Sequence, residues 1–453
     1  MFESQIPLFA RSVRYELQMI NPSLPPRPLV TAGRPFQGRR HLTTVALVCL
    51  AVGACSRRDR AATPQEGRFA SDVAFLQQHT TIVLLADPSR GAQVVVAPGY
   101  QGRVMTSTTG GSNQPSFGWI GRAAIASGQK QPHMNVFGGE DRFWLGPEGG
   151  QYALFFQPGD PFDLDHWQVP EPIDWGAWDV ASQSATAVRL RKRMTLVNYS
   201  RTQIDVDVDR TVRLLTDTEM TEALGVAPGN AVRAVAFESS NTVANVGSAA
   251  WQPHAGLVSV WILGMFNPSM QTTIALPFAS GPGGNDGNNS PLGPVVNDAY
   301  FGKVPADRLV IKDSTIFFRG DGQYRSKIGL SPRRALSVAG SYDASGRVLT
   351  LVQYTRPADA LGYVNSMWEM QREPYKGDVI NSYNDGPPAP GKPPLGPFYE
   401  LETSSPALNL SPGQRYTHVH RTFHLVGPEA ELDRIARTTL KVGLAAMKDA
   451  FGK

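Results

Sequence analysis

Two segments near the end of the chain carry side chains suited to proton transfer. In FYELETSSPALNLSPGQRYTHVHRTFHL, Glu400 and Glu402 lie two residues apart, as do His418 and His420 in the following segment. A β-strand turns alternate residues to the same face, so each pair points one way. If the two strands pair as a hairpin through NLSPGQ, carboxylates and imidazoles lie opposite each other. That arrangement suits general acid/base catalysis near neutral pH.

The two histidines leave two other interpretations open. Both rings of an H-x-H strand project to one side, so His418 and His420 could share a zinc ion, but a third ligand is not assured. Alternatively, this is a polar strand face satisfied by water and cross-strand hydrogen bonds. We predict no bound metal and no cofactor.

The segment GGEDRFWLGPEGG concentrates charge in a chain that is only 18% charged. Its paired glycines permit tight turns, which would bring Glu140, Asp141, Arg142 and Trp144 into one small volume. Trp144 could stack on a sugar face while Arg142 and Asp141 bind hydroxyl groups. Glu140 would then be a partner of the catalytic carboxylate. The alternative is a salt bridge from Arg142 to Glu140 or Glu148 that only fixes the loop.

Further candidates lie beside predicted loops. His133 is a possible proton carrier, although a lone histidine is more often structural. Arg325 and Lys327 share a strand face and could anchor an anionic or hydroxylated ligand. Aromatic, amide and acid groups recur at the remaining positions, which are Trp368, Asn384 and Asp385. Together these groups favour a cleft that binds a polyol.

The elements that position these side chains are mostly strands. At least a dozen β-rich segments are bounded by Gly, Pro, Asn or Asp, whereas helical periodicity occurs only at 70–79 and 428–450. We therefore predict an all-β fold, a large antiparallel sandwich over 69–427 with a C-terminal helix over 428–453. The proline-rich loop at 382–397 is predicted to line the cleft.

The amino-terminal region predicts export. An apolar run, LTTVALVCLAVGAC, follows Arg39 and Arg40 and ends at Cys55. It is too short to span a bilayer stably, and its small residues before cysteine match a bacterial lipobox. We predict a signal peptide at 1–54 with an over-long start, a lipidated Cys55, and a tether at 55–68.

Removing the leader changes the charge balance. Of the chain's 43 basic and 39 acidic residues, the leader holds six and two, so the mature protein retains 37 of each. A neutral chain without a basic stripe gives no reason to expect nucleic-acid binding. We expect a monomer, anchored in the bacterial envelope and facing the periplasm, on the outer membrane rather than the inner.

Three segments carry a resemblance to known proteins. With VVVAPGYQGRVMTS, GGEDRFWLGPEGG and the Glu400 segment, residues 70–427 resemble the galactose mutarotase-like (aldose 1-epimerase) superfamily. The chain is similar, more narrowly, to secreted bacterial lipoproteins of unassigned function. The resemblance implies a supersandwich with Glu402 as the base that opens a sugar ring. The superfamily's catalytic histidine segment has no match here, and only His254 lies near its place.

These features predict an exported lipoprotein that binds carbohydrate. We expect it to act on a sugar or glycan by Glu and His acid/base chemistry, in an epimerase-, lyase- or hydrolase-like reaction. The alternative is a non-catalytic glycan-binding or structural lipoprotein of the envelope.

The leader generates a direct prediction. In a bacterial host with lipoprotein processing, Cys55→Ser should move the protein from the membrane fraction to the soluble fraction and abolish labelling with radioactive palmitate, because the acyl acceptor is lost. Ser56→Ala is the matched control and should leave both unchanged. Palmitate labelling that persists in Cys55→Ser would contradict the assignment.

Overall fold

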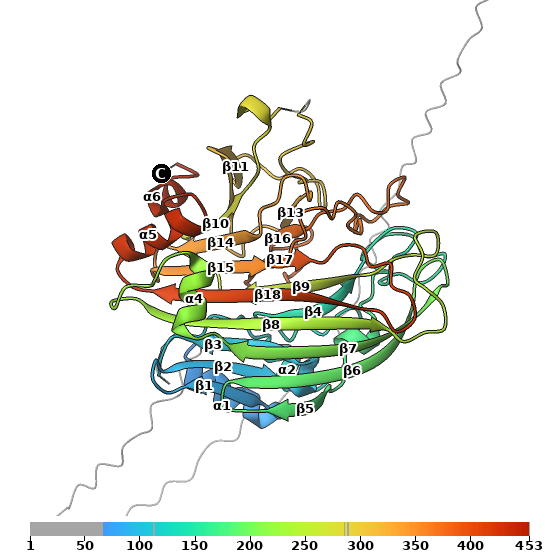
Figure 1. The fold of residues 1–453 in the computed structure, drawn as a ribbon, viewed down its shortest axis with the longest axis horizontal. Coiled ribbons are helices and arrows are strands. Elements are labelled where there is room, and N and C mark those ends of the chain that lie inside the picture. Colours follow the sequence, from blue (N-terminus) through green and yellow to red (C-terminus); the bar gives the residue numbers. More distant parts are fainter. Residues whose placement is uncertain (1–66, 112–113, 285, 288–289, 453) are drawn as a thin grey trace, which may run out of the picture. The chain divides into compact units, whose positions relative to one another are not determined.

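Strands dominate the protein, and every pairing between named strands is antiparallel (Figure 1). The computed structural model describes residues 67–452, apart from 112–113, 285 and 288–289. The predicted all-β antiparallel fold is confirmed. The predicted leader, Cys55 and the tether up to residue 66 lie outside the described residues.

The larger layer is a ten-stranded sheet. Its central strands alternate buried and partly exposed residues, as in β7, where Ile204, Val206 and Val208 point inward. In spatial order the strands are β11 (Leu309–Lys312), β12 (Thr315–Arg319), β10 (Thr272–Pro277), β14 (Val338–Asp343), β15 (Val348–Tyr354), β18 (Arg415–Val426), β8 (Arg233–Asn245), β7 (Gln203–Leu214), β6 (Ala187–Val197) and β5 (Asp179–Gln183).

Two smaller sheets form the facing layer. The five-stranded sheet runs β13 (Ser326–Leu330), β16 (Ile380–Asn384), β17 (Tyr399–Ser404), β9 (Ser259–Phe266) and β4 (Arg142–Gly146). The three-stranded sheet contains β1 (Val83–Asp87), β2 (Ala92–Ala97) and β3 (Arg103–Thr108). A bridge between Val104 and Asp141 joins the two sheets. Apolar residues of both pack on β6, β7 and β8 in the main core.

Short helices cover the outside of the ten-stranded sheet at one end, where α4 lies over the strands (Figure 1). The described helices are α1 (Phe69–His79), α2 (Arg122–Ser127), α3 (Glu171–Asp174), α4 (Asp217–Leu224), α5 (Glu429–Thr439) and α6 (Leu444–Lys448). The C-terminal helix predicted over 428–453 is present as two helices, α5 and α6, with Lys441 between them at a positive φ of 60°. The apolar face predicted for it, Leu432, Ile435, Ala436, Leu440 and Leu444, is fully buried.

The predicted hairpin between the Glu400 segment and the His418 segment is wrong. Strand β17 pairs with β16 and β9 in the five-stranded sheet, whereas β18 pairs with β15 and β8 in the ten-stranded sheet. The two strands lie in opposite layers of the sandwich. The predicted alternation of side chains was correct for each strand. The sheet to which each strand belongs, however, is decided by pairing with strands that are distant in the sequence.

The two histidines meet β17 across the sandwich interior. The Thr403 hydroxyl lies 3.0 Å from His418 Nε2 and 2.9 Å from His420 Nδ1. Burial lowers the pKa of His418 to about 3 and that of His420 to about 4. Both rings are therefore neutral at pH 7 and serve as interior hydrogen-bonding groups.

These buried imidazoles predict a dependence of stability on acid pH. An unfolded histidine binds a proton below about pH 6.5, whereas these two stay neutral in the fold, so each should remove about 2 kcal/mol from the free energy of unfolding between pH 6.5 and pH 5. Urea unfolding measures this slope. The slope reports how many protons the protein takes up on unfolding. His418→Gln should lower that number by about one, while the exposed His254→Gln should leave it unchanged. An unchanged slope in His418→Gln would contradict the prediction.

Candidate functional site

The face of the five-stranded sheet turned away from the sandwich interior carries the charged side chains. The register aligns Lys327 with Tyr383 and Glu400, and aligns Glu402 with Leu263 and Arg142. In the next row, Trp261 lies opposite Trp144. Alternation along five strands thus collects acids, bases and indoles on one surface.

A cavity of about 690 Å³ lies on this surface. The loop after β16 contributes Gly386, Pro388, Pro393 and Leu395 to its lining, so the predicted role of the proline-rich loop is confirmed. The side chains that bring chemistry to the cavity are His133, Arg142, Trp144, Glu148, Asp165, Trp167, Trp261, Arg325, Lys327, Trp368, Tyr383, Asp385 and Glu400.

Two ion pairs form the floor of the cavity. Arg142 Nη2 donates to Glu400 Oε1 at 2.5 Å, and Lys327 Nζ donates to Glu402 Oε2 at 2.9 Å. Trp261 Nε1 donates to the same Glu402 oxygen at 3.0 Å. Glu402 is 1% exposed and is not among the residues that line the cavity, whereas Glu400 is.

Several buried polar atoms at the floor have no hydrogen-bond partner among the described residues. They are Trp144 Nε1, Arg142 Nε and Glu402 Oε1. The Arg142 guanidinium also lies over the Trp144 ring, 4.5 Å from its centroid. An unsatisfied donor in a buried wall costs free energy, so Trp144 Nε1 and Arg142 Nε, whose residues line the cavity, point to a polar ligand.

Burial controls the protonation of the floor. It raises the pKa of Glu400 to about 7, against the opposing charge of Arg142. Burial also raises the pKa of Glu148, which Lys327 opposes. Burial alone would lower the pKa of Lys327, but the charge and hydrogen bond of Glu402 raise it above its usual value.

Most of the other predicted binding residues line the cavity, and one instead holds a neighbouring turn in place. Arg325 lines the cavity with its guanidinium 3.7 Å from the Phe301 centroid, and His133 and Trp368 lie at other walls. Asp385 also lines it, while accepting bonds from Tyr383 Oη at 2.7 Å and from the Gly396 amide at 2.9 Å. Asn384 does not line the cavity, because its amide holds the 321–324 turn.

Glu140 and Asp141 lie away from the cavity. They precede β4 and turn into the sandwich interior, where Glu140 Oε2 lies 2.6 Å from His424 Nε2. Asp141 pairs with the buried Arg210 at 2.6 Å. The alternative in which Arg142 braces its own loop is also wrong, since its carboxylate partner is Glu400.

Sequence reasoning missed Glu148 as a site residue and missed the aromatic walls made by Trp167, Trp261 and Phe301. Glu148 figured only as a partner for Arg142. A signal for it existed, since GPEGG places one acid between residues suited to tight turns. Strand β9, SVWILGMF, is buried throughout, so its sequence gives no sign of which residues face a ligand.

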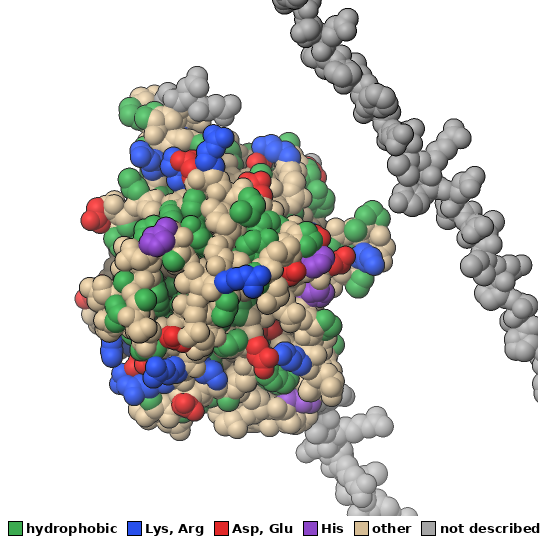
Figure 2. All heavy atoms as spheres, turned by 90° about the vertical axis from the view of Figure 1, so that its right-hand side faces the viewer, with side chains coloured by type: hydrophobic (Ala, Val, Ile, Leu, Met, Phe, Trp, Pro, Cys, Tyr) green, Lys and Arg blue, Asp and Glu red, His purple; other side chains and the backbone are tan. Residues whose placement is uncertain are grey.

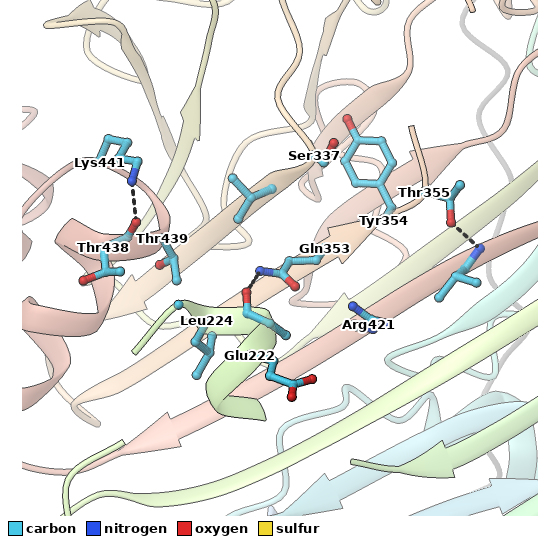
Figure 3. Close-up of a pocket in the computed structure, with 14 residues that line it drawn as sticks. Glu222, Leu224, Ser337, Gln353, Tyr354, Thr355, Arg421, Thr438, Thr439 and Lys441 are labelled. Atoms are coloured by element: carbon cyan, nitrogen blue, oxygen red, sulfur yellow. Dashed lines mark hydrogen bonds between the residues drawn. The ribbon is translucent and has the colours of Figure 1, made fainter. Parts of the chain in front are cut away.

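A second hollow, of about 680 Å³, lies between α4, the end of α5 and strands β14, β15 and β18 (Figure 3). Gln353 Nε2 donates to the Ala223 carbonyl at 2.6 Å, and Lys441 Nζ donates to the Thr438 carbonyl at 2.8 Å. Arg421 pairs with Glu238 at 2.7 Å. Its cations are bonded and at least partly exposed, so this hollow offers less to a catalytic step than the Glu400 cavity.

Metal chemistry gives no competing site among the residues that the structure describes. Acidic and basic side chains are interspersed on the face shown in Figure 2. Within 67–452, gaps excepted, no group of three or more His, Cys, Asp or Glu side chains could hold a metal ion. No helix of that region has the length and apolar character needed to cross a membrane.

Comparison with known proteins gives a family without an assigned activity. The model of a "Family of unknown function (DUF6786)" matches residues 67–451. No curated protein matches the chain in sequence at a significant level.

Solved structures that resemble the fold are distant. A proposed aldose 1-epimerase from Escherichia coli K12 is 14% identical, with 77% of this chain and 99% of that chain covered at a TM-score of 0.46. A galactose mutarotase-like protein from Lactobacillus casei is 11% identical, with 76% and 100% covered at 0.42. A galactose mutarotase related enzyme from Lactobacillus acidophilus is 8% identical, with 76% and 97% covered at 0.41. At these scores nothing about activity follows for this chain.

The ion pairs of the floor predict a large stability effect. Lys327→Met should lower the free energy of unfolding by about 3 kcal/mol, because it leaves the Glu402 carboxylate buried without its cation. The double variant Lys327→Met/Glu402→Gln should recover part of that loss. Lys376→Met, which breaks an exposed pair with Glu373, should have no measurable effect. Urea unfolding measures these changes. If Lys327→Met and Lys376→Met lowered the free energy of unfolding equally, the buried pairing would be refuted.

Proposed function

The chain belongs to a family of unknown function, DUF6786, and from the chemistry of its cavity we propose that it binds a carbohydrate and acts on it by acid/base catalysis. The observation that carries this proposal is the buried Trp144, whose ring forms a cavity wall beside the Arg142–Glu400 pair and whose Nε1 has no partner within the described chain.

The cavity has the composition that a sugar requires. Its volume of about 690 Å³ suits a small saccharide, since ligand pockets span roughly 300–1,000 Å³. Four indoles line the cavity. Cations lie over the rings of Trp144 and Trp261, while the half-buried Trp167 and Trp368 offer apolar faces to C–H groups. Charged groups between them can bind hydroxyls. An apolar ligand would leave those groups unsatisfied.

Glu400 is the carboxylate best placed to exchange a proton with the ligand. It reaches the cavity, Arg142 fixes its orientation, and its pKa of about 7 matches a general base that works near neutral pH. Glu402, the base implied by family resemblance, lies beneath the lining and holds Lys327 in place. We assign Glu402 a positioning role. Of the predicted catalytic histidines, neither His418 nor His420 lines the cavity, and His133 is the imidazole that does.

A binding protein without turnover is the second candidate. Both carboxylates of β17 already contact a cation, which is also how a rigid binding site would be neutralised. The two candidates predict the same affinity for a sugar and differ only in turnover.

The place of action follows from the leader alone. We propose that the protein is exported, anchored through lipid at Cys55, and faces the periplasm, on the outer membrane rather than the inner. A periplasmic site would meet envelope glycans or imported saccharides.

Binding and turnover are tested on one panel of mono- and oligosaccharides. A ligand should change the tryptophan fluorescence, and Trp144→Ala should weaken its affinity roughly tenfold, because part of the cavity wall and the Nε1 donor are lost. Glu400→Gln should keep the affinity within a few-fold and abolish turnover. Met270→Ala, an exposed change, is the control. A panel without any binder would refute the carbohydrate proposal, and binding without turnover would leave the binding protein.

A further inference from the structure

Of the three acids at the floor of the cavity, one has no cation in contact with it; Asp385, a buried acid of the wall, accepts hydrogen bonds from Tyr383 Oη and the Gly396 amide instead. The floor contains three carboxyl groups, Glu148, Glu400 and Glu402, but only two cations, Arg142 and Lys327. Arg142 contacts Glu400 at 2.5 Å, and Lys327 contacts Glu402 at 2.9 Å. Glu148 forms no salt bridge with any described residue, although it is only 8% exposed.

The backbone around Glu148 is held firmly. A Cβ on Gly149 would lie 2.3 Å from the Met367 carbonyl oxygen, so only glycine permits this close approach to the segment before Trp368. The Glu148 amide donates to Ser366 Oγ at 3.2 Å, and Gln151 exchanges two hydrogen bonds with Gln371, at 2.9 and 3.0 Å. These contacts fix the backbone that carries Glu148 in the cavity wall.

Charge balance decides which carboxyl group carries a proton. An ionised carboxylate buried without a cation costs several kcal/mol, so three buried acids beside two cations favour a state that contains one proton. Contact with a cation favours the ionised form of Glu400 and Glu402. The remaining proton belongs on the acid that lacks such a contact.

We propose that Glu148 is the proton-carrying acid of the cavity and the proton donor of the reaction proposed above. Its O–H bond breaks as an oxygen atom of the sugar, in the ring or in a glycosidic bond, accepts the proton. Glu400 accepts a proton from a sugar hydroxyl or from water in the same turnover. The floor thereby keeps its total charge, and Lys327 stabilises the new Glu148 carboxylate.

The proton can be observed without any ligand. Infrared difference spectroscopy between the wild type and Glu148→Gln at pH 7 should show the C=O stretch of one protonated carboxylic acid that the variant lacks. Protons on Glu400, whose pKa is about 7, give a signal common to both proteins. Glu369→Gln, an exposed change next to Trp368, should leave the band in place. If Glu148→Gln fails to fold, Glu148→Asp should shift the band instead. A band that survives unchanged in Glu148→Gln, or none in the wild type, would overturn the proposal.

The donor role rests on the proposed function and is tested separately. On a sugar that the wild type turns over, Glu148→Gln should lower kcat by on the order of 10² to 10⁴ with KM within a few-fold, and should remove the alkaline limb of the pH profile. A full rate in Glu148→Gln would overturn the donor role. Failure of every sugar to bind would refute the carbohydrate proposal instead, and would leave the infrared result intact.

Discussion

The pairing of buried charges on one face of the five-stranded sheet is the constraint on which the site depends. Strand alternation turns Arg142, Lys327, Glu400 and Glu402 to the same surface, where loops cover them. Such groups are tolerated only if each ionised carboxylate meets a cation. The contacts of 2.5 and 2.9 Å meet that requirement and fix the side chains that a ligand would encounter.

The segment GGEDRFWLGPEGG shows how one motif can serve several structural roles. Its first acids enter the sandwich interior, where Glu140 contacts His424 and Asp141 contacts Arg210. Its central residues form β4, which presents Arg142 and Trp144 to the cavity. Of its last glycines, Gly149 packs against Met367 and Gly150 lies beside Gln371. Successive residues of an extended chain alternate in direction, so the neighbours Asp141 and Arg142 lie on opposite sides of the sheet.

Sequence reasoning located much of the cavity wall without locating its chemistry. Arg142, Trp144, Arg325, Lys327, Trp368, Asp385 and Glu400 were all expected at the site and line the cavity. Glu148 was overlooked, because a single acid in a glycine turn has the same local pattern whether it points to solvent or into a cavity. His418 and His420 were placed there through an assumed hairpin that does not form.

By itself, the sequence determined the strand-rich class, the inward face of strands such as β7, and the apolar face of the C-terminal helices, because these follow from periodicity between neighbours. Only the tertiary structure decided that β17 and β18 belong to opposite sheets, and that Glu400 meets Arg142 from a strand 258 residues away. Pairing between distant strands depends on every other strand in the layer, so no local pattern encodes it.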